Sequence, residues 1–349
     1  MNRTVTVYGA YGHTGRFVVA ELRKRGWMPV LSGRDGDRLN AMRAGHGVEV
    51  RPASAGDAAS LDRALAGAVA VINCAGPFAH TAGPVIEAAL RARIPYLDVA
   101  AELEANIDTF ERYTAPARDK GVVVVPAMAF YGGLGDLLAT AAMGDWRAAD
   151  EISIAYGLDS WQPTEGTRAA GRVSRERRGG RRIVFSNYRL EHRSDDAPVG
   201  EWIFPAPLGK QVVVGEFTMA DTVTISRHIR AREIRSYMTV AAVKDVSAAE
   251  TPPLSVDESG RSPQTFIVEV VVRSGDVERR AVARGRDIYA FTAPLVVEAM
   301  ERIVDGRVKA RGVLTAGEAF NASDFLRALS PQHFSFEISS PLAGEEASG

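Results

Sequence analysis

The sequence predicts an α/β protein with a Rossmann-type doubly wound parallel sheet, followed by a second α+β domain built on an antiparallel sheet. Strand-like and helix-like segments alternate until about residue 127, as expected for a parallel sheet covered by helices. After about residue 145, strand-like segments follow one another with no long helix between them. We therefore expect one domain over residues 1–145 and a second over residues 146–286.

The N-terminal unit reads as a strand, a glycine turn and a helix. Apolar and β-branched residues alternate over residues 4–8, and glycines follow at Gly9, Gly12 and Gly15. The first glycine permits a tight turn, the second lets a pyrophosphate approach the backbone, and the third lets the helix pack close to the strand. The helix that follows would aim its free N–H groups at the phosphates. The G-x-x-G-x-x-G spacing differs from the NAD fingerprint and is common in NADP-binding folds of the extended type.

The end of the second strand distinguishes between the two dinucleotides. An NAD site places an acidic residue there to hold the ribose 2′-hydroxyl, whereas this strand ends in Ser32-Gly33-Arg34. Arg34 can form a charge-assisted fork on a 2′-phosphate, so NADP is the expected cofactor. The alternatives are that Arg34, which precedes Asp35, is a solvated surface arginine and that the glycines are ordinary turn residues.

Further strands are expected over residues 48–50, 68–75, 96–99 and 122–125. Ligands of open parallel sheets bind beyond the carboxyl ends of the strands, so the residues at those ends are the candidates for cofactor binding. These are Gly9, Tyr11, Gly12, His13, Thr14, Gly15, Ser32, Gly33, Arg34, Ala75, Gly76 and Pro77.

The second half is expected to contain antiparallel strands, followed by C-terminal helices. The helical pattern returns after residue 287, and we expect residues 287–338 to fold back on the first domain and make it discontinuous. Residues 339–349 are small and polar and are expected to be disordered. The strands are expected over residues 151–158, 182–190, 211–217, 222–229, 234–242, 265–273 and 277–283.

The composition of the chain limits its partners. The 349 residues are 46% hydrophobic and carry a formal net charge of −1, which argues against nucleic acid or an anionic membrane as the main partner. Cys74 is the single cysteine, so no internal disulfide is possible, and no histidine spacing suggests a metal site. No apolar run is long enough to span a bilayer and no signal peptide is evident, so a cytosolic protein is expected.

The chain resembles the saccharopine dehydrogenase-like NADP-binding oxidoreductases, including the trans-acting enoyl reductase group. The resemblance rests on the glycine turn with its Ser-Gly-Arg strand end, and on three further segments that follow in order over nearly the whole chain. These segments are residues 71–78, which end in Gly-Pro-Phe, residues 96–102, and residues 289–293 with 312–315. The sequence departs from the family pattern at Ala82-Gly83, at Ala101 and over residues 128–136, where nicotinamide and substrate should meet.

Three residues are candidates for the proton donor that a hydride transfer needs. Glu102 follows the fifth strand, and its alternative role is a carboxylate that caps a helix. Tyr131 lies in a glycine-rich loop after the sixth strand and could instead pack beneath the cofactor. His80 follows the Gly-Pro-Phe turn and could instead be solvent-exposed. No Tyr-x-x-x-Lys pair occurs, so the catalytic pair of short-chain dehydrogenases is missing.

The resemblance implies an NADP-dependent reductase acting on a C=C, C=N or C=O group of a small metabolite or carrier-bound acyl chain. The antiparallel sheet of the second domain could also form the interface of a homodimer. A non-catalytic NADP(H)-binding redox sensor and an interaction protein with a vestigial nucleotide site are the alternatives. The arginine-rich stretch over residues 168–193 reads as a solvated hairpin or flap, or as a docking surface for an anionic substrate or carrier.

Overall fold

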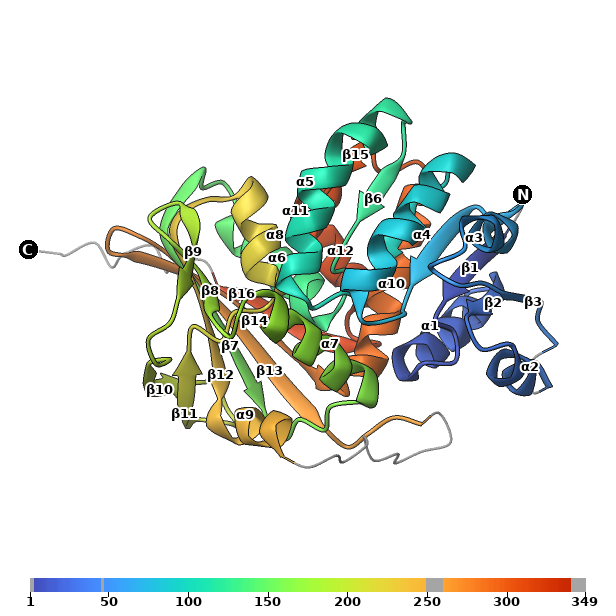
Figure 1. Ribbon diagram of the computed structural model, residues 1–349. Helices are drawn as coiled ribbons and strands as arrows, with labels where there is room; N and C mark the ends of the chain where they lie inside the picture. Colours follow the sequence, from blue (N-terminus) through green and yellow to red (C-terminus); the bar gives the residue numbers. More distant parts are fainter. Residues whose placement is uncertain (1–2, 45–46, 249–259, 340–349) are drawn as a thin grey trace, which may run out of the picture.

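The computed structural model describes residues 3–44, 47–248 and 260–339. Within them the chain forms two sheets, one carrying the N-terminal half and the other most of the C-terminal half (Figure 1). The first sheet has seven strands in the order β15-β6-β5-β4-β1-β2-β3, and all its pairings are parallel. This confirms the predicted Rossmann-type sheet.

The first sheet is apolar on both faces, so helices must cover both. Helices α1 and α10 share one hydrophobic cluster with β1, and helices α3, α4 and α5 lie in a second cluster with β4 and β5. The elements of this part are β1 (Thr4–Tyr8), α1 (His13–Lys24), β2 (Met28–Gly33), α2 (Gly36–Ala44), β3 (Val50–Pro52), α3 (Ala58–Leu65), β4 (Ala70–Asn73), α4 (Phe78–Ala92), β5 (Tyr96–Asp98), α5 (Leu103–Asp119), β6 (Val123–Val125), a π-helical turn (Phe130–Leu134) and α6 (Gly135–Met143).

The second sheet has nine strands and is mixed, whereas the sequence predicted an antiparallel one. Its main path runs β10-β11-β12-β7-β13-β14-β16, with β8 pairing to both β12 and β9. Strands β12 and β7 run parallel because a long crossover containing α7 and α8 connects them. The elements are β7 (Ala148–Leu158), α7 (Glu165–Arg177), β8 (Arg182–Ser186), β9 (Arg189–Arg193), β10 (Val199–Ile203), β11 (Lys210–Gly215), α8 (Ala220–His228), β12 (Arg230–Thr239), α9 (Val240–Ser247), β13 (Thr265–Ser274) and β14 (Val277–Arg286).

Two segments differ from the sequence-based prediction. Residues 222–229 were predicted as a strand because Thr, Val and Ile dominate them, but they form most of α8. Every residue from Ala220 to Ile225 is buried, so tertiary packing overrides the β-propensity of these side chains. The first half of the arginine-rich stretch forms the helix α7 and not a hairpin or flap.

After the second sheet the chain returns to the first. Helix α10 (Ile288–Val304) packs on α1, and β15 (Gly312–Val313) pairs in parallel with β6. Helices α11 (Ala316–Ala319) and α12 (Ala322–Leu329) follow, and β16 (Phe334–Ser339) then pairs with β14 of the second sheet. The expected disordered tail lies, except for Ser339, outside the described residues, and the predicted domain boundaries stay a prediction.

No helix in the described ranges is both long enough and apolar enough to cross a membrane. The same residues contain no group of three or more His, Cys, Asp or Glu side chains that could hold a metal ion.

A half-buried ion-pair cluster holds α1 against α10. Arg25 Nε contacts Glu21 at 2.7 Å, and its Nη1 contacts Glu298 at 2.8 Å and Glu301 at 2.7 Å. Trp27 Nε1 donates to the second oxygen of Glu301 at 2.7 Å. One guanidinium therefore joins the first helix of the chain to the helix that returns from the second domain.

Replacing Arg25 with Ala should lower the free energy of unfolding by about 2–4 kcal/mol, because the carboxylates of Glu21 and Glu301 are left without their cation. Urea unfolding measures this loss. The matched control is Arg307→Ala, which removes an exposed ion pair to Asp305 and should change stability by less than about 0.5 kcal/mol. Equal effects of the two variants would contradict the assigned role of Arg25.

Candidate functional site

The order of the first sheet reverses between β1 and β4. Strands β2 and β3 lie on one side of this point, and β5, β6 and β15 lie on the other. Open parallel sheets bind ligands in the crevice at such a switch point, beyond the carboxyl ends of the strands. The turns after β1 and β4 meet there, because a Cβ on Gly9 would lie 2.7 Å from the backbone nitrogen of Ala75.

The glycine turn brings helix α1 unusually close to β1. Gly9 has φ +86°, and a Cβ on Gly15 would lie 2.2 Å from the carbonyl oxygen of Gly9. Only glycine fits at Gly15. Gly12 is the N-cap residue of α1, and no side chain caps this end. The first-turn amides of α1 are therefore available to an anion.

Two buried polar atoms of this turn and the neighbouring strand have no hydrogen-bond partner. They are Nε2 of His13 and Oγ of Ser32, the latter at the end of β2. Burial lowers the pKa of His13, which favours the neutral imidazole. Buried polar atoms normally have partners, so both atoms fit a site that a polar ligand completes. The free amides and these atoms together suit a dinucleotide.

Cationic and aromatic side chains gather at the end of β2. Arg34 is exposed directly after the strand, and the Arg38 guanidinium lies 4.7 Å from the centre of the Tyr11 ring. Burial raises the pKa of Tyr8, and the nearby charge of Arg34 opposes this shift. The arrangement offers positive charge and ring faces for the 2′-phosphate and adenine half of a dinucleotide. Arg38, on the first turn of α2, was not predicted as a site residue.

A buried hydrogen-bond network ties together the ends of β4, β5 and β6. Asn73 Nδ2 donates to the Tyr96 hydroxyl at 3.1 Å, which donates to Asp98 Oδ2 at 2.8 Å. Asp98 Oδ1 accepts from the amides of Ala100 at 3.0 Å and Ala127 at 2.8 Å. Burial raises the pKa of Asp98 to about 6. Asp98 therefore fixes the loops that border the crevice.

Glu102 lies at the crevice, but its carboxylate is already engaged. Its two oxygens accept from the amides of Phe78 at 2.7 Å and Ala79 at 3.1 Å, at the start of α4. Burial raises the pKa of Glu102 to about 7. This geometry matches the capping role, and it holds the turn formed by Gly76 and Pro77 in place.

Tyr131 lies in the buried turn between the two sheets. Its hydroxyl has no hydrogen-bond partner, and its ring centre lies 5.1 Å from those of Tyr156 and Trp161. Burial raises the pKa of Tyr131 well above its ordinary value. The turn is buried throughout, so Tyr131 is a packing residue in this conformation and does not reach the open part of the crevice.

Asp221, which the sequence analysis missed, lies beside Tyr131 and Tyr156. It is fully buried on the first turn of α8, and no hydrogen bond of normal geometry reaches its oxygens. The Tyr156 hydroxyl and the Gly132 amide are near it, and burial raises the pKa of Asp221 to about 7. It was missed because its segment was predicted to be a strand.

His80 is the exposed member of the three proton-donor candidates. It lies in the first turn of α4, where its amide donates to the Pro77 carbonyl at 3.1 Å. The imidazole is thus carried on the helix that starts at the crevice. The structure brings His80 and Glu102 to this helix end and leaves Tyr131 in the interior.

The arginine-rich stretch is mostly engaged in ion pairs. Its arginines contact acidic residues of α5 and of the loop after β11: Arg177 pairs with Asp108, Arg178 with Glu104, and Arg182 and Arg193 with Glu216. These contacts favour a structural role for most of its charges.

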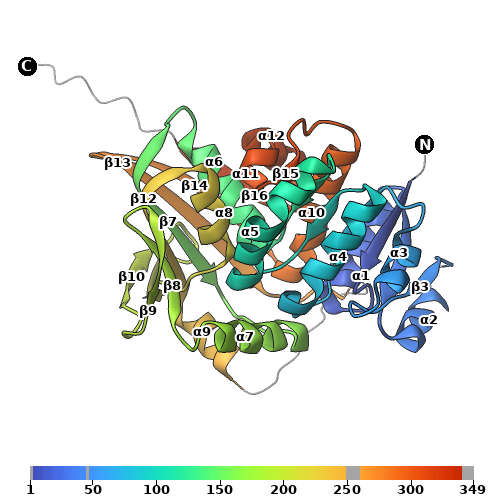
Figure 2. The same ribbon diagram turned by 45° about the horizontal axis from the view of Figure 1, so that its top comes forward.

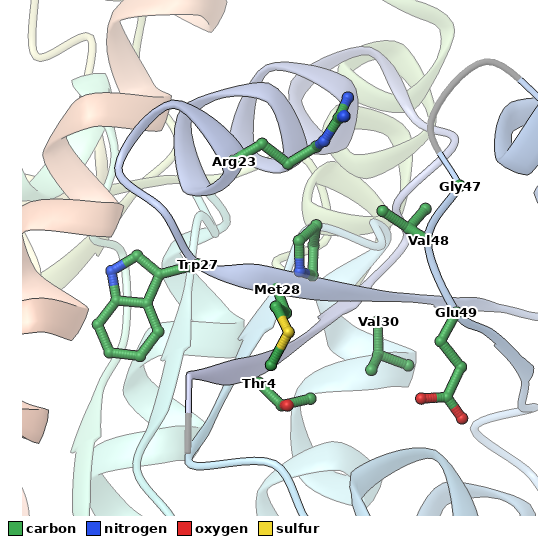
Figure 3. A pocket seen from close by; sticks show the side chains of 9 residues that line it. Thr4, Arg23, Trp27, Met28, Val30, Gly47, Val48 and Glu49 are labelled. Carbon is green, nitrogen blue, oxygen red and sulfur yellow. The ribbon is translucent and has the colours of Figure 1, made fainter. Parts of the chain in front are cut away.

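A hollow of about 330 Å³ lies at the other end of the strands of the first sheet, away from the glycine turn (Figure 3). Thr4 and Met28, the first residues of β1 and β2, line it, so it faces the amino ends of the strands. Its charged side chains, Arg23 and Glu49, come from different elements and do not point toward each other in Figure 3. We assign it no part in the dinucleotide site.

Comparison with known proteins agrees with this geometry. A family model described as the saccharopine dehydrogenase NADP binding domain matches residues 5–125. The saccharopine dehydrogenase-like oxidoreductases of Bos taurus and Homo sapiens are 27% and 26% identical to this chain over 145 residues, which are 36% of this chain and 34% of each relative. The match therefore spans about a third of the length of these curated relatives.

The fold likeness extends further than the sequence likeness. Apo saccharopine dehydrogenase (L-Glu forming) from Saccharomyces cerevisiae superposes with a TM-score of 0.67 over 97% of this chain and 100% of that chain, at 11% identity. This shows that the two chains share both the parallel sheet and the second mixed sheet.

Replacing Arg34 with Ala should weaken NADPH binding by about 10- to 100-fold, because a charge-assisted contact to the 2′-phosphate is lost. NADH has no such phosphate, so its affinity should change much less. Fluorescence titration measures both. Arg91→Ala, which removes an exposed pair to Asp62, is the control. Equal losses for the two dinucleotides in Arg34→Ala would contradict the assignment.

The contribution of three buried carboxyl groups to the free energy of unfolding should fall as pH rises from about 4 to about 7. Burial raises the pKa of Asp98 to about 6 and those of Glu102 and Asp221 to about 7, so at these three groups the folded state binds more protons than the unfolded state in this window. Asp221→Asn should make the dependence shallower, as measured by urea unfolding at several pH values. Asp62→Asn, at an exposed position, is the control variant. An unchanged pH dependence in Asp221→Asn would show that Asp221 does not take up a proton on folding.

Proposed function

We propose that this chain, whose residues 5–125 form an NADP-binding domain of the saccharopine dehydrogenase type, is an NADP-dependent oxidoreductase. Its substrate carries a C=C, C=N or C=O group on a small metabolite or on a carrier-bound acyl chain. The observation that carries the proposal is the β1–β4 switch point. The uncapped amides of α1 lie on its β1 side, and α7 approaches Gly76 on its β4 side.

The chain's residues divide the cofactor site into two halves. Arg34 and Arg38 would hold the 2′-phosphate beyond β2, and the first-turn amides of α1 would hold the pyrophosphate. The nicotinamide would then lie toward β4, beside Gly76 and Pro77. When bound there, NADPH supplies the hydride at C4 of its nicotinamide ring.

Two elements that follow β6 would restrict the access of water to the nicotinamide half of the site. Helix α7 approaches the end of β4, since a Cβ on Gly76 would lie 3.9 Å from the Cβ of Ala170. The Phe130–Leu134 turn is buried beside Tyr156 and Trp161. A dry, shaped site of this kind strengthens polar contacts to the reacting group.

His80 is the residue best placed to give a proton to the reduced group. It is exposed on the first turn of α4, next to the Gly76-Pro77 turn, and imidazole is the commonest general acid near neutral pH. Glu102 holds the same helix end through the amides of Phe78 and Ala79, so it orients His80 and the turn together. Tyr131 supports the wall of the site from the interior.

A non-catalytic NADP(H) sensor is the second candidate. Two of the three predicted proton donors, Glu102 and Tyr131, are buried. A site with so few accessible acids is what a protein that binds NADP(H) without turnover would have. NADPH absorbance in the presence of candidate enones, imines and ketones separates the two functions. Oxidation of NADPH supports the reductase, whereas tight binding without turnover on any of them supports the sensor.

Replacing His80 with Gln should lower turnover by about 100-fold or more and leave the Kd for NADPH unchanged, because Gln cannot transfer the proton. His192→Gln, at an exposed position on β9, is the matched control and should keep full turnover. Full turnover in His80→Gln would move the proton donor to another residue.

A further inference from the structure

Helix α7 is attached to the rest of the protein in an unusual way. It runs from Glu165 to Arg177, and Ser174 is its only buried residue. Most helices of this length are stabilised by an apolar face packed on a core. The apolar side of α7 consists of Ala169, Ala170 and Val173, all only half-buried, so polar contacts contribute much of its attachment.

The position of α7 places it over the nicotinamide half of the proposed cofactor site. It contacts α4 and α5, and both views show it below α5 (Figures 1 and 2). A Cβ on Gly76 would lie 3.9 Å from the Cβ of Ala170. The helix therefore approaches the end of β4 and leaves Gly76 exposed.

The C-terminal half of α7 is held by two acidic residues of α5. Ser174 Oγ donates to Glu104 at 2.5 Å, Arg178 Nη1 lies 3.4 Å from the same carboxylate, and Arg177 Nη2 lies 2.6 Å from Asp108. These contacts are partly exposed to solvent, where ion pairs add little to stability. They can hold α7 in a closed position and still allow it to open.

The N-terminal end of α7 is held by Tyr289 of α10. The Tyr289 hydroxyl accepts from the Thr164 amide at 3.2 Å and lies 3.0 Å from Thr167 Oγ1. The centre of its ring lies 5.2 Å from that of His13, in an edge-to-face contact. Tyr289 therefore touches both the start of α7 and the glycine turn of the cofactor site.

A glycine pair follows the helix and could serve as its hinge. Gly179 and Gly180 have φ of +61° and +74°, and a Cβ on either would meet no atom within 4 Å. Their amides donate to the carbonyls of Glu176 and Arg175 at 3.0 Å and 2.9 Å, so the pair ends the helix. Glycine without packed neighbours can absorb dihedral changes once these two hydrogen bonds open.

We propose that α7 is a lid over the nicotinamide half of the NADP site, and that Tyr289 is the positioning residue through which bound cofactor holds the lid closed. The lid rests on the Glu104 and Asp108 contacts, turns on Gly179-Gly180, and meets the cofactor turn through the Tyr289–His13 contact. This inference rests on the proposed NADP binding. Bound cofactor would favour the closed form because it orders the glycine turn and, through His13, the Tyr289 side chain that bonds the start of α7.

Hydrogen exchange of the full-length protein with and without NADPH tests the lid. The amides of residues 165–178 should exchange about tenfold more slowly when NADPH is bound, because the ligand shifts the population toward the closed form. In Tyr289→Phe, NADPH should still bind, but its protection of residues 165–178 should be lost. The double variant Glu104→Gln/Asp108→Asn should speed exchange of the same residues without NADPH.

Tyr113→Phe is the matched control, because it removes a tyrosine hydroxyl on α5 that bonds Glu87 away from α7. It should keep the NADPH protection of residues 165–178. A purely structural loss in Tyr289→Phe would instead speed exchange in the strands of both sheets and lower the Tm, which would overturn the lid.

NADPH titration by fluorescence, run on the same samples, distinguishes failure of the lid from failure of NADP binding. Binding to the unaltered protein with no change in exchange at residues 165–178 overturns the lid and leaves the proposed function standing. Absence of NADPH binding overturns both.

Discussion

The close approach of Gly15 to the carbonyl of Gly9 is the constraint on which the rest of the molecule depends. A side chain at Gly15 would lie 2.2 Å from that oxygen, so only glycine lets α1 start directly above β1. This contact aims the uncapped end of α1 at the crevice. The other end of α1 carries Arg25, which binds α10 and so fixes where the chain returns from the second domain. The Gly15–Gly9 contact thereby sets the cofactor turn, and the Arg25 cluster at the other end of α1 sets the position of α10.

Charged groups at the end of β2 suit a dinucleotide. Arg34 and Arg38 offer guanidinium donors there, where a phosphate would lie, while Asp35 and Asp37 stand between them in the chain. On the opposite side, burial raises the pKa values of Asp98 and Glu102, and backbone amides share their oxygens. Asp98 and Glu102 therefore carry less negative charge than exposed carboxyl groups would. They can line the nicotinamide half of the site with little repulsion of the cofactor phosphates.

The sequence predicted the parts of the fold that local patterns determine. The parallel sheet and its glycine turn followed from strand alternation and from Gly9, Gly12 and Gly15. Helix α8 did not, because its β-branched residues favour a strand and only burial between the two domains makes them helical. Asp221 was missed for the same reason. The role of Glu102 could not be decided from sequence, since its amide partners at Phe78 and Ala79 are about 24 residues away in the chain.

A crystal structure of the protein with NADP⁺ tests the central claim most directly. The account predicts the pyrophosphate on the first-turn amides of α1, the 2′-phosphate at Arg34, and the nicotinamide beside Gly76 with α7 over it. A dinucleotide bound elsewhere, or bound with its nicotinamide at the end of β2, would contradict the account.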